Sequence, residues 1–395
     1  MKPSAPGTEP AARCHLCGSE NLRLTPEFAA LARITSDCKP WPVGGTLGRC
    51  WDCGLVQTAV TPRWQAEVRD IYAAYTIYHQ AAGKEQSIFA APGAAGHARS
   101  EVIVRRLLEQ FALPSWGMLL DVGCGNGSFL RACSSSLPGW KLWGSEVDDK
   151  YASQVMSIPG VEQHHSGALE DLAEQFDVIS LIHVLEHIPG PHAFLQRLWD
   201  KLEPGGLLVV EVPDARLNPF AMVVADHCSH FTPGALAEIV SAAGFEVLEA
   251  TGSWVPREVS VVAKKSSASP QTRAPRVPDT DGAHVLAGAQ WLAQIAAEAR
   301  PLACSDKFGI FGTSLGGTWL EAQTGLASKF FVDEDLNRIG QQVLGKPVIA
   351  PAQIAEGAVV YVALPQPLAG RIALRLARAG ISVHQPPPLP AEPRA

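Results

Sequence analysis

The sequence lacks any apolar run close to the roughly 20 residues that a helix needs to cross a bilayer. Its first residues, "MKPSAPGTEPAARC", contain no apolar core and so do not resemble a secretory signal peptide. It also lacks a surplus of positive charge, because 32 Lys and Arg face 39 Asp and Glu. Proteins that bind nucleic acids neutralise phosphates with such a surplus. We therefore expect a cytoplasmic protein that contacts neither a membrane nor a nucleic acid.

The chain has enough apolar residues to form more than one core. Of its 395 residues, 47% are apolar, and no internal repeat is visible. This length is typical of two or three domains. In a cytoplasmic protein the nine cysteines are expected to be thiols or metal ligands rather than disulfides.

Shifts in composition divide the chain into regions. A segment rich in Ser, Pro and charge reads as a linker, and the Pro-rich end "QPPPLPAEPRA" reads as a disordered tail. We predict an α/β protein with a cysteine-containing domain over 1–75, a central αβ domain over 76–264, a linker over 265–282, a second Rossmann-like αβ domain over 283–384 and a tail over 385–395.

The central region alternates strands with helices. Four near-continuous apolar runs predict strands that are buried on both faces of a parallel sheet, at 117–122, 141–147, 176–184 and 207–213. A helix is expected over 192–202. Two last strands, 245–252 and 257–264, are joined by only four residues. That connection is too short for a helical crossover, so this pair must be antiparallel.

Two Cys-x-x-Cys pairs lie in the first domain. Cys14 and Cys17, and then Cys50 and Cys53, are each followed by glycine in "CHLCG" and "CWDCG". Four thiolates from two such turns suit tetrahedral Zn²⁺, and four protein ligands leave no open position for water. We therefore predict a structural zinc site in an N-terminal zinc-binding domain. Four free cysteines or a redox dithiol are the alternatives.

A glycine-rich turn in the central domain predicts a cofactor site. In "LLDVGCGNGSFL", Asp121 ends a strand and is followed by Gly123, Gly125 and Asn126. A second acid, Glu146, ends the next strand, where a carboxylate can hold ribose hydroxyls. The Asp121 carboxylate would repel a pyrophosphate but suits a positively charged ligand, which favours S-adenosylmethionine (SAM).

These segments resemble the class I SAM-dependent methyltransferases. "DVGCGNG" is similar to their first motif, "GSEVD" to the second, and "FDVISLIHVLEHIPGP" and "LEPGGLLVVEVP" to their fourth and fifth strand segments. The final antiparallel hairpin is also a feature of that family. The resemblance implies that Asp121, Gly123, Gly125 and Asn126 line the methionine and ribose part of SAM. It further implies that Glu146 binds the ribose hydroxyls and that Ala168 and Leu169 flank the adenine.

The order of the three domains resembles a narrower group, the zinc-containing bacterial nucleotide-sugar C-methyltransferases. "CWDCGLVQ" is similar to their second cysteine turn, and the segment from "FGIFGTSLGG" to "VVYVALP" to their C-terminal domain. The resemblance implies a nucleotide-linked keto sugar as small-molecule substrate. Thr313 and Ser314 in the glycine turn could contact a diphosphate at a helix N-terminus, or the turn could simply pack a helix on a strand. We expect a monomer or a homodimer.

Methyl transfer from a sulfonium needs alignment, and a carbon or oxygen acceptor must also lose a proton. Histidine is the usual base, and two sources lie at the expected pocket edge: His183 and His187 in "HVLEHI", and the loop "ADHCSHF". We predict His227 as the base, supported by Asp226, with His183 in the pocket and His187 and His230 near the substrate. A metal site or a polar cap are the alternatives for this loop.

The same loop leaves the methylated atom open. In the resembled C-methyltransferases it is similar to "Tyr-His-Glu-His-x-x-Tyr-Phe-Ser", so Asp226 and His227 take the Glu-His place, but the upstream tyrosine falls on Val224. C-methylation and O-methylation both remain open. Tyr72, Tyr75 and Tyr78 have helical spacing, which fits either one packed helix face or a lid whose Tyr75 and Tyr78 reach the substrate.

Two other functions are alternatives to this prediction. One is a methyltransferase that acts on RNA or protein with the zinc domain as recognition module. The other is a scaffold that binds SAM without turnover. The acidic charge balance argues against RNA.

Overall fold

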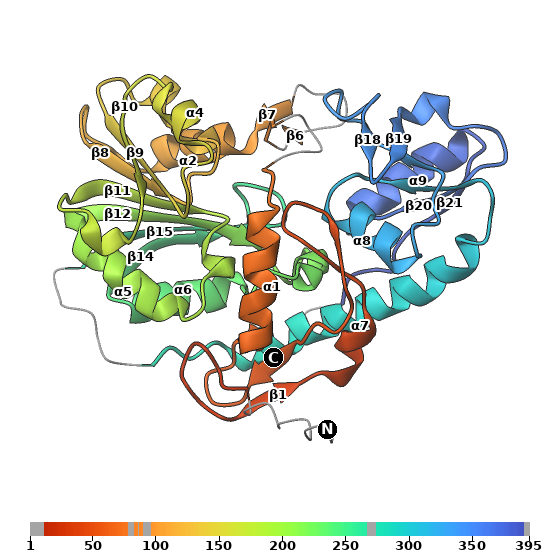
Figure 1. The fold of residues 1–395 in the computed structure, drawn as a ribbon, viewed down its shortest axis with the longest axis horizontal. Coiled ribbons are helices and arrows are strands. Elements are labelled where there is room, and N and C mark those ends of the chain that lie inside the picture. Colours follow the sequence, from red (N-terminus) through yellow and green to blue (C-terminus); the bar gives the residue numbers. More distant parts are fainter. Residues whose placement is uncertain (1–11, 78–82, 86, 90–95, 267–273, 391–395) are drawn as a thin grey trace, which may run out of the picture.

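The computed structural model describes residues 12–77, 83–85, 87–89, 96–266 and 274–390. Two large sheets lie on either side of a central helix, α1 (Pro62–Ala73), and a long helix, α7 (Asp279–Leu302), runs from below α1 along the lower side of the right-hand sheet (Figure 1). The sheet on the left of that view belongs to the central domain and the sheet on the right to the C-terminal domain. In the part of the chain that is described, no helix is both long and apolar enough to cross a membrane.

The N-terminal region is built from short strands. Three of them pair antiparallel, and a fourth joins from far along the chain: β1 (Leu22–Leu24), β4 (Gly48–Cys50), β5 (Val56–Gln57) and β13 (Ser229–His230), in that order. A separate hairpin is formed by β2 (Arg33–Ile34) and β3 (Pro40–Trp41), after the 3-10 turn η1 (Pro26–Ala30). Helix α1 follows because Thr61 caps it, its hydroxyl accepting the Trp64 N–H, with Pro62 in the first turn.

The central sheet has seven strands. Their order is β10 (Val161–Ser166), β9 (Lys141–Glu146), β8 (Met118–Val122), β11 (Phe176–Ile182), β12 (Leu202–Pro213), β15 (Glu258–Lys265) and β14 (Phe245–Thr251). The first five are mutually parallel, and β15 is antiparallel to both of its neighbours. The predicted antiparallel last pair is therefore confirmed. Strand β12 begins five residues earlier than the apolar run at 207–213, because Leu202 pairs with Phe176 across a shift in register.

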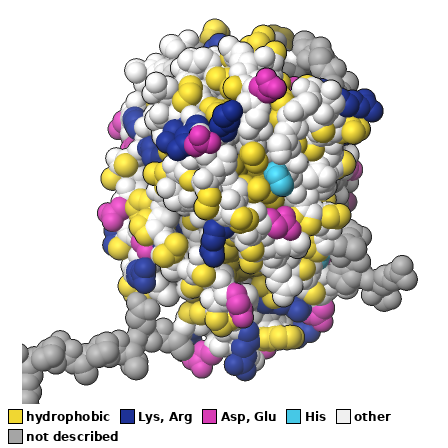
Figure 2. Space-filling model, turned by 90° about the vertical axis from the view of Figure 1, so that its right-hand side faces the viewer, with side chains coloured by type: hydrophobic (Ala, Val, Ile, Leu, Met, Phe, Trp, Pro, Cys, Tyr) yellow, Lys and Arg dark blue, Asp and Glu magenta, His cyan; other side chains and the backbone are white. Residues whose placement is uncertain are grey.

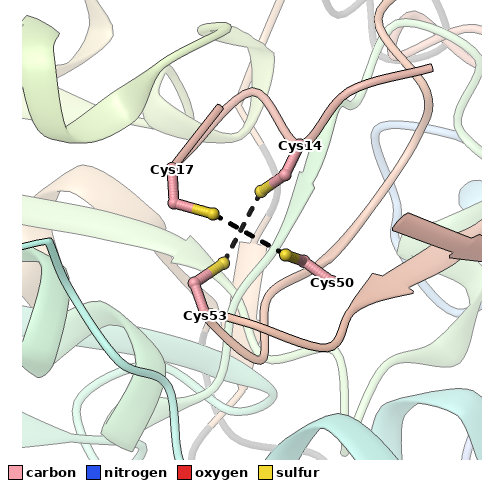
Figure 3. A group of neighbouring side chains, drawn as sticks. All are labelled: Cys14, Cys17, Cys50 and Cys53. Carbon is pink, nitrogen blue, oxygen red and sulfur yellow. Dashed lines mark hydrogen bonds between the residues drawn. The ribbon is translucent and has the colours of Figure 1, made fainter. Parts of the chain in front are cut away.

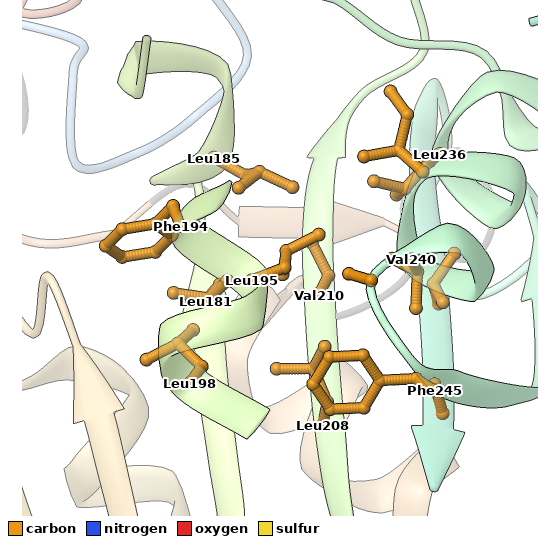
Figure 4. Close-up of a cluster of buried hydrophobic side chains, with 14 of the residues drawn as sticks. Leu181, Leu185, Phe194, Leu195, Leu198, Leu208, Val210, Leu236, Val240 and Phe245 are labelled. Carbon is orange, nitrogen blue, oxygen red and sulfur yellow. The ribbon is translucent and has the colours of Figure 1, made fainter. Parts of the chain in front are cut away.

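Helices cover both faces of this sheet. Helices α2 (Arg99–Gln110) and α3 (Ser128–Ser136) share one buried core with the sheet, and α5 (Pro191–Lys201) and α6 (Pro233–Ala242) share another. Figure 4 shows the second core, where Leu195 and Leu198 of α5 meet Val210 and Phe245 of the sheet. The remaining short elements are the hairpin β6 (Ser87–Phe89) and β7 (Gly96–Ala98), helix α4 (Ala152–Met156) and the turns η3 (Leu169–Asp171), η4 (Leu185–His187) and η5 (Pro219–Val223).

The C-terminal domain has its own mostly parallel sheet. Its order is β18 (Gln342–Val343), β19 (Lys346–Ile349), β17 (Phe330–Val332), β16 (Phe308–Phe311), β20 (Val359–Val362) and β21 (Ser382–His384), with α8 (Leu315–Gln323), α9 (Leu368–Arg378) and η6 (Pro351–Gln353). A Cβ on Gly317 would lie 1.8 Å from the Gly312 carbonyl oxygen. The glycine turn is therefore required to pack α8 against β16.

The linker and the tail are more ordered than the sequence predicts where the structure describes them. Helix α7 begins at Asp279, inside the predicted linker, and the Val277 N–H donates to the Cys53 carbonyl at 2.7 Å. In the tail, the Pro387 carbonyl accepts a hydrogen bond from the Trp291 indole at 2.9 Å, and Leu389 packs against a buried core. Interspersed charges of both signs cover the face of the C-terminal domain in Figure 2, with scattered apolar residues between them.

Candidate active site

One cavity of about 810 Å³ lies where the three regions of the chain meet. The ends of four parallel strands supply one wall, because Asp121, Glu146, His183 and Pro213 end or follow β8, β9, β11 and β12. Ligands of open αβ sheets bind at this edge. Residues from the N-terminal region and the C-terminal domain also line the cavity, among them Ser36, Trp64, Ser314, Leu315 and Arg338. Its volume suits a cofactor together with a small acceptor.

The glycine turn brings the backbone close to this cavity. The φ angles of Gly123 and Gly125 are 72° and 51°, in the left-handed region that favours glycine. A Cβ on Gly123 would lie 2.4 Å from Cγ2 of Val184. The Gly125 N–H donates to Oε2 of Glu146 at 3.0 Å, so this carboxylate is tied to the turn.

All seven residues that the resemblance assigns to SAM line this one cavity: Asp121, Gly123, Gly125, Asn126, Glu146, Ala168 and Leu169. Asn126 additionally donates to the Gly83 carbonyl at 2.9 Å. Glu146 keeps its second oxygen, Oε1, on the Val147 N–H at 2.8 Å. The structure thus brings together residues that are up to 48 positions apart, between 121 and 169.

Asp121 carries the electrostatic signature of a site for a cation. It is 2% exposed, and its Oδ1 accepts the Ser180 hydroxyl at 2.8 Å. Burial raises the pKa of this carboxyl to about 7, while the Ser180 hydrogen bond opposes that shift. A buried carboxylate of this kind is stabilised by a positively charged group. The sulfonium and ammonium groups of SAM carry the positive charge that would stabilise this carboxylate.

His183 is held in an unusual conformation at the end of β11. Its φ is 56°, which non-glycine residues rarely adopt. Its Nε2 lies 2.7 Å from the Arg99 guanidinium and its Nδ1 3.2 Å from Oε1 of Glu186. Oε2 of Glu258 lies 3.4 Å from Nε2. His183 therefore lines the cavity with both ring nitrogens next to charged groups.

The loop "ADHCSHF" crosses the cavity beside η4. His227 lines the cavity, and its Nδ1 donates to the Ala221 carbonyl at 3.1 Å. Oδ1 and Oδ2 of Asp226 accept the Ser36 N–H at 2.9 Å and the Ser36 hydroxyl at 2.5 Å. The sequence predicts that Asp226 supports His227. In the structure the Asp226 carboxylate instead pairs with Nδ1 of His187, at 3.3 Å.

The two cavity histidines differ in their charge. Burial would lower the pKa of His187, but the hydrogen bond and charge of Asp226 raise it to about 9. Burial and the neighbouring His187 lower the pKa of His227 to about 4. The rings meet edge to face with centroids 4.6 Å apart. At neutral pH His227 is thus neutral and keeps a free lone pair, while the adjacent cationic His187 opposes its protonation.

Some of the remaining predicted substrate residues line the cavity and others do not. Tyr75 and Ser314 line the cavity, as does His187. His230 does not: it pairs with Val56 in the N-terminal sheet and is 4% exposed, so its prediction as a substrate contact is corrected.

Thr313 is likewise absent from the cavity wall. Its hydroxyl donates to Asp333 at 2.5 Å and accepts from Arg338 at 2.8 Å, so it holds the turn together. Tyr78 lies outside the described residues. Helix α1 ends at Ala73, so Tyr72 is helical and Tyr75 lies beyond the helix.

Sequence reasoning missed several residues of the cavity wall. Ser36 and Trp64 carry no local signal, because only the tertiary fold brings them to the "ADHCSHF" loop. Arg257 also lines the cavity, from the turn between β14 and β15. Its place next to the tip of the predicted hairpin, at the start of the strand 257–264, is the signal that could have marked it.

The four N-terminal cysteines converge, as Figure 3 shows. The Cys14 and Cys53 sulfurs are 3.5 Å apart and the Cys17 and Cys50 sulfurs 3.7 Å apart, with all four within 4.8 Å of one another. Four sulfurs at about 2.3 Å from a tetrahedral ion would be separated by about 3.8 Å. The cluster therefore has the spacing of a tetrahedral zinc site. His15 is engaged elsewhere, by the Cys228 carbonyl and the Gly190 N–H.

Comparison with known protein families supports the assignment of the central domain. Residues 95–250 match the family model of a methyltransferase domain. This segment is a class I SAM-dependent methyltransferase domain. The prediction from the glycine turn and the reversed last strand is thereby confirmed for the domain, while the narrower resemblance to nucleotide-sugar C-methyltransferases stays a prediction.

Relatives of known name match about a third of this chain or less. A ubiquinone biosynthesis O-methyltransferase of Cereibacter sphaeroides is 28% identical over 166 residues, which are 35% of this chain and 65% of that protein. A trans-aconitate 2-methyltransferase of Deinococcus radiodurans is 26% identical, over 29% of this chain and 42% of that protein. A solved SAM-dependent methyltransferase of Mesorhizobium loti covers 41% of this chain and 97% of its own, with 14% identity and a TM-score of 0.35.

Proposed function

We propose that the protein transfers the methyl group of SAM to a small-molecule acceptor bound in the cavity between its three regions. The observation that carries the proposal is the continuity of this cavity. It joins the seven residues assigned to SAM with His187, which ends η4, and His227, from the loop after η5. A cofactor site and a proton-accepting cluster in one enclosed space are what methyl transfer to oxygen or carbon requires.

The cofactor half binds and orients. SAM supplies an activated methyl group on a sulfonium. Glu146, held by the Gly125 and Val147 N–H groups, is placed to accept hydrogen bonds from ribose hydroxyls. Asp121 offers a buried negative charge to the cationic methionine end. Ala168 and Leu169 offer an apolar edge for the adenine ring.

The acceptor half removes a proton. His227 has its Nδ1 occupied as a donor to Ala221, so Nε2 carries the lone pair of the neutral ring. The paired Asp226 and His187 fix the neighbouring ring. We propose that the acceptor loses its proton at this cluster.

The acceptor class proposed is a nucleotide-linked sugar or a related glycan precursor. Ser314 at the N-terminus of α8, together with Arg257 and Arg338, gives the acceptor side donors for an anionic group. Val224, at the position of the tyrosine in the resembled C-methyltransferases, is 1% exposed in a buried core and does not line the cavity. The two relatives named above include an O-methyltransferase, and we favour an oxygen atom as the methyl acceptor.

We propose further that Cys14, Cys17, Cys50 and Cys53 hold a structural Zn²⁺. The sulfur spacing supports this, and Gln57 donates to the Cys14 sulfur at 3.0 Å, as partners of metal-bound thiolates do. The ion would fix the N-terminal sheet, and β5 of that sheet pairs with β13 of the catalytic loop.

Product mapping tests the proposed function. The protein is incubated with methyl-labelled SAM and a panel of nucleotide-linked sugars in deuterated water. Label on an acceptor oxygen without deuterium on the ring carbons is the expected result. Deuterium at a ring carbon would indicate enolate chemistry and C-methylation, and no labelled product from any small molecule, with label on protein or RNA instead, would contradict the proposed acceptor class.

A further inference from the structure

Three side chains that can bind metal ions lie close together at the acceptor end of the cavity. Glu186 and His187 come from η4, and His227 comes from the loop after η5. All three line the cavity, and each offers one ligand atom such that the three atoms lie within 4.8 Å of one another. Two imidazoles and one carboxylate in such a group form a donor set that binds divalent transition metals.

The hydrogen bonds around the two histidines fix which nitrogens are free. Nδ1 of His187 faces the Asp226 backbone carbonyl at 3.1 Å and Oδ2 of Asp226 at 3.3 Å. Nδ1 of His227 faces the Ala221 carbonyl at 3.1 Å. These oxygens only accept, so each Nδ1 must carry the hydrogen. Among the described residues neither Nε2 has a hydrogen-bond partner, and metal-binding histidines are oriented in this same way. Binding of the ion would displace the Nε2 proton of His187, which is cationic before binding.

Glu186 supplies an independent observation. It is 1% exposed, and neither of its carboxylate oxygens has a hydrogen-bond partner in the described part of the chain. Nδ1 of His183 lies 3.2 Å from Oε1. A buried carboxylate without hydrogen bonds is costly, and each such group calls for an explanation. A bound cation facing Glu186 provides one.

We propose that Glu186, His187 and His227 bind one divalent first-row metal ion at the acceptor end of the cavity. Ligand distances of about 2.0–2.2 Å require the three atoms to come within about 3.4 Å of one another, so binding of the ion would draw the three side chains closer together than their present spacing of up to 4.8 Å. Three protein ligands leave coordination positions open toward the cavity. This distinguishes the site from the four-cysteine cluster, where all four positions are filled by protein.

The inference rests on the proposed function and specifies how the acceptor loses its proton. An acceptor hydroxyl bound at an open position has a lowered pKa and releases its proton to water. The oxygen then forms the bond to the methyl carbon, and the carbon–sulfur bond breaks with its electron pair on sulfur. The products are the methyl ether, S-adenosylhomocysteine and one proton. The oxidation state of the ion does not change.

Metal titration of the full-length protein tests the site directly. Mn²⁺ is the first probe, because this hard ion prefers oxygen and nitrogen ligands and does not compete for thiolates. Co²⁺ is the second, since it binds such sites more tightly, and its thiolate absorption band reports any exchange into the four-cysteine cluster. Electron paramagnetic resonance of free Mn²⁺ is expected to show saturable uptake of one ion per chain.

Variants locate the ion. Glu186→Gln and His227→Asn are each expected to weaken uptake at least tenfold. His230→Asn is the matched control, because His230 belongs to the same loop but lies in β13, away from the cavity wall. Unchanged zinc content at the four cysteines shows that each variant is folded. Wild-type protein that takes up neither probe, or variants that bind as wild type does, would overturn the inference.

Separate readouts keep this inference distinct from the proposed function. SAM binding by calorimetry and methyl transfer are measured with the second ion present and after its removal by chelator. Turnover that is unchanged by chelation overturns the metal site and leaves His227 as the direct base, with methyl transfer intact. A folded protein that binds the ion but not SAM would support the site and overturn the proposed function.

Discussion

The two halves of the cavity are built in different ways. The cofactor half comes from one stretch of chain. Asp121 lies near the end of β8, Glu146 ends β9 and Ala168 follows β10 of the same sheet. The acceptor half is assembled from Ser36 of the N-terminal region, His227 of the central domain and Ser314 of the C-terminal domain. The first depends on local chain geometry and the second on how the three regions pack.

This difference indicates which parts of the protein would determine SAM binding and which would determine the choice of acceptor. A site made from one sheet edge can be kept while its surroundings change, and the domain match at 95–250 contains all of the cofactor half but not Ser36 or Ser314 of the acceptor half. Acceptor choice depends on contacts between regions, such as the Ser36 hydrogen bonds to Asp226. Changes in the acceptor half should therefore spare SAM binding, and changes in the cofactor half should not.

The largest effect is expected from loss of the four-cysteine cluster. Structural zinc sites contribute about 10–16 kcal/mol of apparent binding free energy at neutral pH. Cys50→Ser should therefore remove zinc, loosen the N-terminal sheet and abolish turnover, because that sheet holds β13 of the catalytic loop in place. Metal analysis, thermal unfolding and SAM titration on one preparation measure this. A variant that loses zinc but keeps full turnover would contradict the dependence of the acceptor half on this sheet.

His227→Asn is the sharper break within the acceptor half. The change removes the cavity-facing Nε2 but retains a side chain that can donate to Ala221 or accept from a neighbour. Turnover is expected to fall about 10²- to 10⁴-fold, the range for loss of a group that promotes proton transfer. Affinity for SAM, measured by calorimetry, should stay within about threefold. An equal loss of both would show that the two halves are not separable.

Glu146→Ala should have the reverse selectivity. It removes the acceptor for ribose hydroxyls and for the Gly125 N–H, and hydrogen bonds to a charged group contribute about 1.5–3 kcal/mol each. SAM affinity should fall about 10- to 100-fold, measured by calorimetry. Glu246→Ala, an exposed position on β14, is the matched control and should bind SAM as wild type does. Unchanged affinity in Glu146→Ala would move the cofactor away from the predicted half.

The smallest expected effect is on the pH dependence of protein stability, and it comes from a buried carboxyl group on β12. Glu211 is fully buried, and burial together with the nearby Glu258 raises its pKa to about 8. The unfolded value is about 4.3, so the folded state holds a proton that the unfolded chain releases between these pH values. Stability from this group therefore falls as pH rises from about 4.3 to about 8.

Glu211→Gln removes that loss. The variant should unfold a few degrees higher than wild type at pH 8, and the difference should shrink toward pH 5. Thermal unfolding across this range measures it, with Glu246→Gln on the exposed side of the same sheet as control. A constant difference between Glu211→Gln and wild type at all pH values would show that titration of Glu211 is not its cause.

The halves also differ in how far the sequence predicted them. Asp121, Gly123, Gly125, Asn126 and Glu146 could be named because a glycine turn and strand-ending acids have fixed places in a parallel sheet. Ala168 and Leu169 could be named only from the family resemblance. His227 could be named from its loop, but its partners could not. Asp226 pairs with His187 and Ser36, and these contacts depend on the packing of η4 and the N-terminal hairpin against that loop.

Two errors have the same physical origin. His230 was expected at the substrate, yet two residues of its loop form β13 and pair with β5, which turns His230 into the N-terminal sheet. Thr313 was expected at a diphosphate, yet its hydroxyl is engaged by Asp333 and Arg338. Both are local patterns that contacts with distant segments redirect.

Calorimetric titration with SAM tests the central claim most directly, because it needs no knowledge of the acceptor. Wild-type protein with its zinc content confirmed should bind one SAM per chain, and His227→Asn should bind it with nearly the same affinity while Glu146→Ala binds it about 10- to 100-fold more weakly. Folded wild-type protein that shows no saturable SAM binding, or Glu146→Ala that binds as tightly as wild type, would contradict the account.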